Sequence, residues 1–134
     1  MTAAGDTPIS ELVEDEVVHI EPEASLNEVA RALATANIGA VILGDKSQVT
    51  GIVSERDLVQ AFARDCDPRR TRAVDVAHTN LIWCDSEATV AEVATEMMER
   101  YVRHVLVEED GKLIGIVSAR DLLGVYASDE VEAE

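Results

Sequence analysis

Two serine–aspartate pairs in this chain could bind a phosphorylated sugar. Ser54 and Asp57 lie three residues apart, and Ser118 and Asp121 repeat the pair 64 positions later (118 − 54 = 64). A hydroxyl beside the amide N–H groups of a helix N-terminus can join in binding phosphate, and a carboxylate can accept two hydrogen bonds from a ribose diol. Phosphate and ribose are adjacent in a nucleotide, so the pairs predict nucleotide contacts. The same spacing also predicts a simpler role, in which each serine caps a helix and each aspartate completes a capping box.

Arginines accompany both pairs. Arg56 and Arg120 lie between the serine and the aspartate, and Arg103 precedes a predicted strand. A guanidinium group could offset the charge of a bound phosphate. The alternative for Arg56 and Arg120 is a surface position paired with neighbouring acidic residues.

The pairs belong to an internal repeat of the whole chain. GIVSERD at positions 51–57 returns as GIVSARD at 115–121, and the register holds without a gap from residue 7 to 126. Because a unit of about 60 residues is marginal alone, we expect two halves that pack face to face around one core. The predicted division is a first repeat at 7–64, a linker at 65–72, a second repeat at 71–126 and an acidic tail at 127–134.

Each repeat predicts the order strand, helix, strand, strand, helix. In the first, we expect strands at 17–20, 40–43 and 49–53, a helix capped by Ser25 that ends near Asn37, and a helix from Glu55 onward. In the second, the strands are expected at 81–84, 104–107 and 113–117, with a helix capped by Thr89. Both serine–aspartate pairs then stand at strand-to-helix corners of an α+β fold.

Met97, Met98 and Tyr101 follow a helical spacing that could suggest a ligand pocket. A methionine and aromatic stripe at this spacing more often packs in a core, so we assign all three to the core.

Composition narrows the function further. The 27 acidic residues outnumber 11 lysines and arginines, for a net charge of −16 at pH 7, which disfavours binding to nucleic acid or to a membrane surface. Only two lysines are present. This composition is typical either of plain solubility or of a salt-rich cytosol, as in a halophilic archaeon. The two cysteines have no metal-ligand spacing, and we expect a cytoplasmic protein with reduced thiols, no signal peptide and no membrane span.

The two GIVSxRD segments, the segment YVRHV at positions 101–105 and the repeat order together resemble a pair of cystathionine-β-synthase (CBS) domains. The resemblance covers roughly residues 7–126. It implies a regulatory module in which two repeats pack through their sheets about a pseudo-two-fold axis and leave two clefts for AMP, ADP, ATP or S-adenosylmethionine. In that family the serine meets phosphate, the aspartate meets ribose, and domain pairs form disc-like dimers through the helices that follow the motif.

The resemblance also implies which residues complete each cleft. The first would combine Ser54, Arg56 and Asp57 with Asn80, Leu81, Arg103 and His104. The second would combine Ser118, Arg120 and Asp121 with Glu16, Val17, Gly39 and Ala40. Because the second set places an acidic residue and no cation opposite the motif, we expect it to be empty or to prefer an uncharged or cationic adenosyl ligand. The alternative for His104 is a structural or solvent-facing position, and His19 and His78 are given no role.

These observations predict a freestanding sensor that needs no cofactor, is not an enzyme, binds an adenine nucleotide or S-adenosylmethionine, and forms a homodimer that acts on an unidentified protein. The main alternative is a structural or protein-interaction module with vestigial clefts. A hydrolase is the weakest alternative, because the sequence offers no evident catalytic base or metal site.

Overall fold

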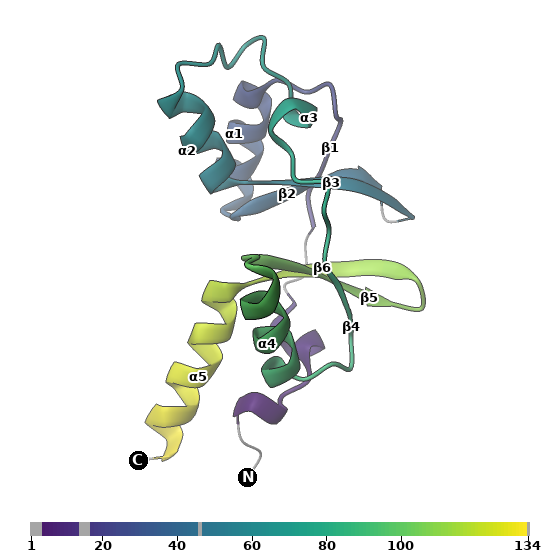
Figure 1. Ribbon diagram of the computed structural model, residues 1–134, viewed down its shortest axis with the longest axis vertical. Coiled ribbons are helices and arrows are strands. Elements are labelled where there is room, and N and C mark those ends of the chain that lie inside the picture. The colour runs from purple at the N-terminus through teal and green to yellow at the C-terminus, as the bar shows by residue number, and fades with distance from the viewer. Residues whose placement is uncertain (1–3, 14–16, 46, 134) are drawn as a thin grey trace. The chain divides into compact units, whose positions relative to one another are not determined.

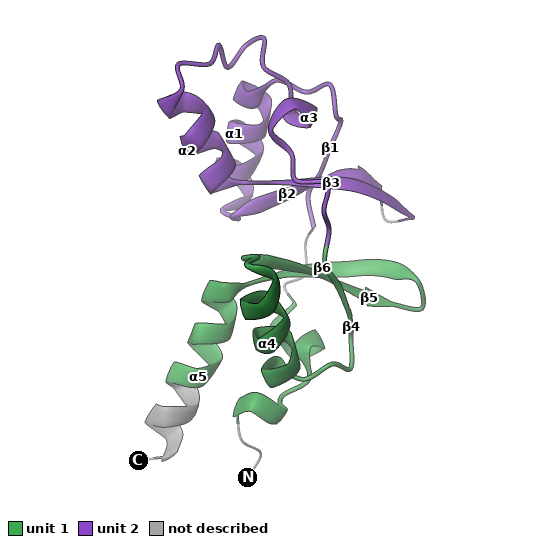
Figure 2. Ribbon diagram, in the orientation of Figure 1, with its two compact units in different colours: residues 1–16, 82–134 green, residues 17–81 purple. Residues whose placement is uncertain are grey.

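The computed structural model describes residues 4–13, 17–45 and 47–133, with side chains described up to residue 127 (Figure 1). The chain divides into two compact units (Figure 2). One comprises residues 17–81, and the other combines residues 1–16 with residues 82–134.

The unit of residues 17–81 contains a three-stranded sheet and three helices. Its strands are β1 (His19–Ile20), β2 (Ala40–Asp45) and β3 (Gln48–Ser54); β1 is parallel to β2, and β2 is antiparallel to β3. Its helices are α1 (Leu26–Ala36), α2 (Glu55–Ala63) and α3 (Ala73–Val76). The core is built from alternate residues of the strands and one face of each helix: Leu26, Val29, Leu33, Val41, Leu43, Val53, Leu58, Ala61 and Ala73.

The other unit repeats this plan. Strands β4 (Trp83–Asp85), β5 (His104–Glu109) and β6 (Lys112–Ser118) form its sheet, with β4 parallel to β5 and β5 antiparallel to β6. Helices α4 (Val90–Arg100) and α5 (Ala119–Ala133) accompany the short 3₁₀ helices η1 (Ala4–Asp6) and η2 (Ile9–Leu12). The core contains Ile9, Val90, Val93, Met97, Val105, Val107, Val117 and Leu122. Each unit therefore buries a core cluster of its own.

The predicted element order and the α+β class are confirmed. The hydroxyl of Ser25 accepts a hydrogen bond from the Glu28 amide at the start of α1, and Asn37 ends that helix in the left-handed conformation with φ of 55°. Thr89 caps α4 and forms a capping box with Glu92. These signals are local, because a cap needs only a side chain within three residues of the amide that it satisfies.

Two expectations about the second repeat are wrong, and one about the acidic end of the chain is incomplete. Met97 is buried as predicted, but Met98 is 78% exposed and Tyr101 is 94% exposed. Met98 is next to Met97 on a helix and so turns about 100° away from the core face, and Tyr101 lies beyond α4 in a left-handed conformation that ends the helical spacing. The segment that we expected as a tail continues α5, which runs to Ala133.

The segment that leads into each sequence repeat packs in the unit formed by the other repeat. The Ile9 amide donates to the Ala88 carbonyl at 2.7 Å, and the Val90 amide donates to Thr7 at 2.8 Å. With an offset of 64, the Ala73 amide donates to Ala24 at 2.7 Å, and the Leu26 amide donates to Thr71 at 3.0 Å. We call residues 4–13 and 66–78 the lead segments. The lead segment before the first repeat thus belongs to the compact unit of the second repeat, and the lead segment before the second repeat belongs to the compact unit of the first.

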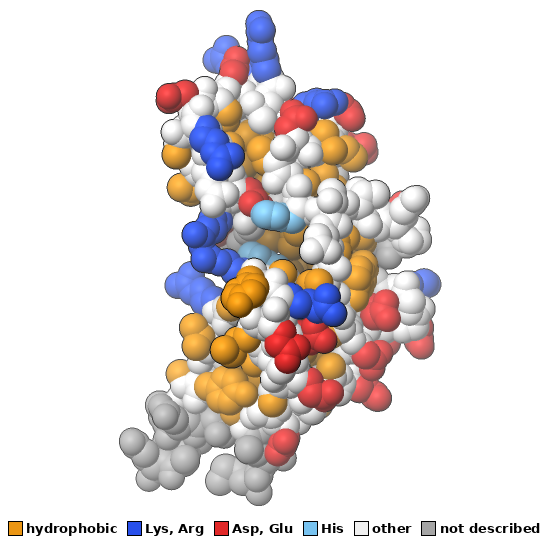
Figure 3. Space-filling model, viewed as in Figure 1, with side chains coloured by type: hydrophobic (Ala, Val, Ile, Leu, Met, Phe, Trp, Pro, Cys, Tyr) orange, Lys and Arg blue, Asp and Glu red, His pale blue; other side chains and the backbone are white. Residues whose placement is uncertain are grey.

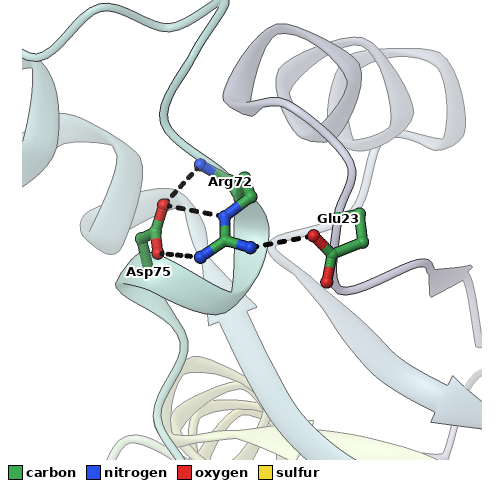
Figure 4. Close-up of polar contacts among 3 residues, drawn as sticks. All are labelled: Glu23, Arg72 and Asp75. Atoms are coloured by element: carbon green, nitrogen blue, oxygen red, sulfur yellow. Dashed lines mark hydrogen bonds and ion pairs between the residues drawn. The ribbon is translucent and has the colours of Figure 1, made fainter.

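Arg72 fastens the second lead segment to the loop before α1 (Figure 4). Its guanidinium group lies 2.8 Å from Glu23 and 3.1 Å from Asp75, and its amide donates to Asp75 at 2.8 Å. The hydrogen bonds from the Arg72 backbone and side chain hold the pKa of Asp75 below its usual value. All three side chains are substantially exposed, so solvent screens these ion pairs and they contribute little stability.

Candidate functional site

The first serine–aspartate corner is a helix cap built around a buried carboxylate. Ser54 ends β3 and is the N-cap of α2, and its hydroxyl accepts from the Asp57 amide at 3.4 Å. Asp57 Oδ2 in turn accepts from the Ser54 amide at 2.7 Å and from the Ser54 hydroxyl at 3.0 Å. Asp57 is only 6% exposed. The capping interpretation is therefore confirmed, and the cap leaves the other oxygen, Oδ1, for a different partner.

The second corner repeats this geometry. The Ser118 amide donates to Asp121 Oδ2 at 2.8 Å, and the Asp121 amide donates to the Ser118 hydroxyl at 3.1 Å. Asp121 is less buried than Asp57. Capping and ligand binding do not exclude one another, because a carboxylate offers about four acceptor positions and the cap uses only some of them.

The first amide of each helix is already occupied. The Glu55 amide donates to the Gly39 carbonyl at 2.9 Å, and the Ala119 amide donates to the Arg103 carbonyl at 2.9 Å. The backbones of Gly39 and Arg103 therefore stand beside the serine–aspartate corner of their own unit. Fewer amides remain for a phosphate at these helix N-termini than the sequence alone suggested.

The other predicted residues divide between the units. Asn80, which is exposed, and Leu81, which is half-buried, belong to the unit of Ser54 and Asp57, as do half-buried Val17 and Ala40 at the start of β2. Half-buried His104 begins β5 in the unit of Ser118 and pairs with that serine in the strand register. The contributions of Arg103 and His104 to the first cleft, and of Val17, Gly39 and Ala40 to the second, stay predictions. Glu16 lies outside the described residues.

Arg56 and Arg120 are exposed at the second position of α2 and α5. Neither forms an ion pair with any residue that the structure describes. The surface pairing that we considered for them is therefore not seen in this part of the chain.

His78 is the site residue that the sequence analysis missed. Its Nε2 lies 2.6 Å from Asp57 Oδ1, although the two residues are 21 positions apart. The backbone holds it there, because the His78 amide donates to Ile52 at 2.9 Å and its carbonyl accepts from the Ile52 amide at 3.0 Å. No local pattern signals this contact, since it depends on the lead segment running beside β3.

The glycine that opens each GIVSxRD motif makes room for a lead segment. A Cβ added at Gly51 would lie 3.2 Å from both the Ala77 Cβ and the His78 carbonyl oxygen, and one added at Gly115 would overlap Val13 Cγ1. Ala77 and Val13 are themselves 64 residues apart (77 − 13 = 64). The motif glycine therefore has a steric role in bringing the segment that carries His78 to the corner.

Two other kinds of site find no support in the described residues. Among them, no group of three or more histidine, cysteine and acidic side chains could hold a metal ion. Within the same part of the chain, the helices are too short or too polar for any of them to cross a membrane.

Comparison with known proteins identifies both repeats. Residues 6–64 and 73–128 match the model of the CBS domain. The chain is 27% identical over 128 residues to an uncharacterised protein of Methanocaldococcus jannaschii. That match covers 95% of this chain but only 45% of the M. jannaschii protein. It is 31% identical over 100 residues to hypoxic response protein 1 of Mycobacterium tuberculosis, covering 73% of this chain and 70% of that protein.

A solved structure shows the same fold. A CBS domain protein of Pyrobaculum aerophilum complexed with AMP superposes with a TM-score of 0.76 at 29% identity. The match covers 90% of this chain and 98% of the solved chain.

Proposed function

The chain belongs to the CBS domain family, and on that premise we propose that it is a freestanding regulatory module, not an enzyme, that binds an adenosine-containing ligand. AMP, ADP, ATP and S-adenosylmethionine are the candidates. The observation that carries this proposal is the pair of serine–aspartate corners, whose amide-to-carboxylate distances of 2.7 Å and 2.8 Å are nearly equal. The relative from P. aerophilum, whose structure was solved with AMP, supports a nucleotide ligand.

Each corner would place its aspartate on ribose and its serine on phosphate. We propose that Arg56, Asn80 and Leu81 join the first site and that Arg103 and His104 complete it. Arg120, Val17, Gly39 and Ala40 would complete the second. The sites are unequal, because only the first set adds cations from both repeats to offset a phosphate.

Isothermal titration calorimetry on Asp57→Ala and Asp121→Ala tests this assignment. Each substitution removes the capping carboxylate of its own corner, so each variant controls for the effect of losing a cap in the other. We expect Asp57→Ala to abolish binding of an adenine nucleotide and Asp121→Ala to weaken it less. The reverse order would refute the assignment of the sites.

A thermal-shift panel of AMP, ADP, ATP, S-adenosylmethionine and NAD, at high and low salt, separates the sensor from an interaction module with vestigial clefts. A ligand at 100 times its Kd stabilises the folded state by about 2.7 kcal/mol, which raises the melting temperature by several degrees. No shift with any compound would favour the interaction module.

We also propose that two copies associate through α2 and α5, as part of a homodimer that regulates an unidentified protein. On α2, Val59 is 65% and Phe62 is 44% exposed; on α5, Leu123 is 69% and Tyr126 is 40% exposed. The two pairs are related by the offset of 64 (123 − 59 and 126 − 62). Figure 3 shows apolar side chains (orange) among the charged ones at the molecular surface. A second copy would bury these four exposed apolar side chains, and each repeat supplies an equivalent pair.

The acidic composition suggests a salt-rich cytoplasm as the working environment. With a net charge of −16, self-repulsion opposes folding when the Debye length is long. We expect the melting temperature to fall as NaCl is reduced from about 2 M to about 0.05 M, where the Debye length grows severalfold. A melting temperature independent of salt would contradict this adaptation.

A further inference from the structure

His78 occupies the carboxylate oxygen of Asp57 that the helix cap leaves open. Asp57 Oδ2 already accepts two hydrogen bonds, from the amide and the hydroxyl of Ser54. Oδ1 faces His78 Nε2 at 2.6 Å. Because a carboxylate can only accept, Nε2 is the donor. The Asp57 carboxylate has about four acceptor positions on its two oxygens, and these three hydrogen bonds leave one of them open.

A ribose diol that binds a carboxylate through both hydroxyls needs two acceptor positions. We propose that His78 is a specificity-determining residue of the first site, because it competes with one ribose hydroxyl for Asp57 Oδ1. This inference rests on the proposed function, since it assumes that Asp57 receives ribose. It makes the first site less selective for ribose over deoxyribose than its buried carboxylate alone would be.

The side chain of His78 can leave without disturbing the fold. Its backbone is fixed to β3 by two hydrogen bonds with Ile52, but the imidazole is 64% exposed. Rotation of one exposed side chain therefore opens Oδ1, while the cap between Ser54 and Asp57 stays in place.

The experiment compares AMP with 2′-deoxy-AMP, which has a single ribose hydroxyl at this edge, by titration calorimetry. Wild-type protein should bind the two within about threefold, since His78 offsets the gain from the second hydroxyl. His78→Ala should bind AMP about five- to tenfold more tightly than wild type and leave 2′-deoxy-AMP unchanged, because a hydrogen bond to a charged group is a strong one. His78→Gln, whose amide can still donate to Oδ1, should resemble wild type. Thr79→Ala, at the exposed neighbouring position, is the matched control.

The outcomes separate this inference from the proposed function. If AMP binds wild type and His78→Ala equally, or if both nucleotides gain equally, His78 does not compete and the inference falls while the nucleotide site stands. If neither nucleotide binds either protein, the proposed function fails and the inference with it. Should His78→Ala not fold, wild type alone decides: a preference for AMP of tenfold or more overturns the inference, and near-equal affinities support it.

Discussion

Replacing Gly115 by alanine tests whether the first lead segment packs on β6 as the structure shows. The added Cβ would overlap Val13 Cγ1 and lie 3.1 Å from Val13 Cβ and 3.3 Å from Cγ2. Overpacking of this kind costs about 1–3 kcal/mol. Because the added Cβ overlaps Val13 Cγ1 outright, the cost lies in the upper part of that range, at about 2–3 kcal/mol. Alanine recovers roughly 0.5–1 kcal/mol of that cost, because it loses less conformational entropy than glycine in a strand. We therefore expect a net loss of about 1–2 kcal/mol.

Thermal and urea unfolding measure this loss. At roughly 3 °C per kcal/mol for a chain of this size, Gly115→Ala should melt about 3–6 °C below wild type. Gly51→Ala should lose less, since its closest new contacts are 3.2 Å. Gly124→Ala is the matched control: it lies in α5 with nothing within 4 Å of an added Cβ, so it should gain about 0.5–1 kcal/mol.

The double variant Gly115→Ala/Val13→Ala assigns the cause. Truncation of Val13 removes both Cγ atoms that the new methyl would meet, so the two substitutions should together cost about 1 kcal/mol less than the sum of their separate effects. Two results would refute the reasoning. One is a Gly115→Ala protein as stable as wild type, and the other is a double variant whose loss is additive, because then the lead segment does not lie on β6.

Three further predictions concern the helix caps, the thiols and the exposed apolar side chains. Thr89→Ala should destabilise the protein by about 1 kcal/mol in urea unfolding through loss of the α4 cap, whereas Thr95→Ala on the same helix should not, and equal effects would contradict the capping role. Burial, with Asp85 and Glu108 nearby, raises the pKa of the Cys84 thiol from 9.0 to about 11. Only the thiolate reacts, so at pH 8 iodoacetamide should label Cys84 about 100-fold more slowly in folded than in unfolded protein, as followed by mass spectrometry; equal rates would show an ordinary thiol. If two copies associate as proposed, light scattering should find wild type as a dimer and Val59→Asp combined with Leu123→Asp as a monomer at unchanged helix content. A monomeric wild type would refute the proposed dimer, and a double variant that stays dimeric would exclude α2 and α5 as the interface.

The elements of each repeat were predictable because their signals are local. Ser25 and Thr89 cap helices whose apolar positions recur every three or four residues, and a short polar segment separates the apolar run of β2 from β3 and that of β5 from β6. The capping boxes of both corners follow from a spacing of three residues. Such features need no knowledge of the remaining chain.

The wrong predictions concern two side chains, Met98 and Tyr101. For these, the spacing of apolar residues along the sequence does not determine whether the side chain points to the core or to solvent. Met98 follows the stripe of apolar residues on α4, yet it points to solvent because the core contacts only the face of Val90, Val93 and Met97. Tyr101 has the spacing of a core residue but follows the end of the helix.

The amino-acid sequence by itself determined that one strand-to-helix corner occurs twice and that each carries a capping serine and aspartate. Only the tertiary structure decided what meets those corners. The lead segments cross to the unit of the other repeat, which places His78 on Asp57 and Val13 on Gly115. The physical reason is the separation along the chain. A cap forms between residues within one helical turn, so the local sequence encodes it. The contact of His78 with Asp57 spans 21 positions (78 − 57) and that of Val13 with Gly115 spans 102 (115 − 13), so both depend on the path of the chain in the fold.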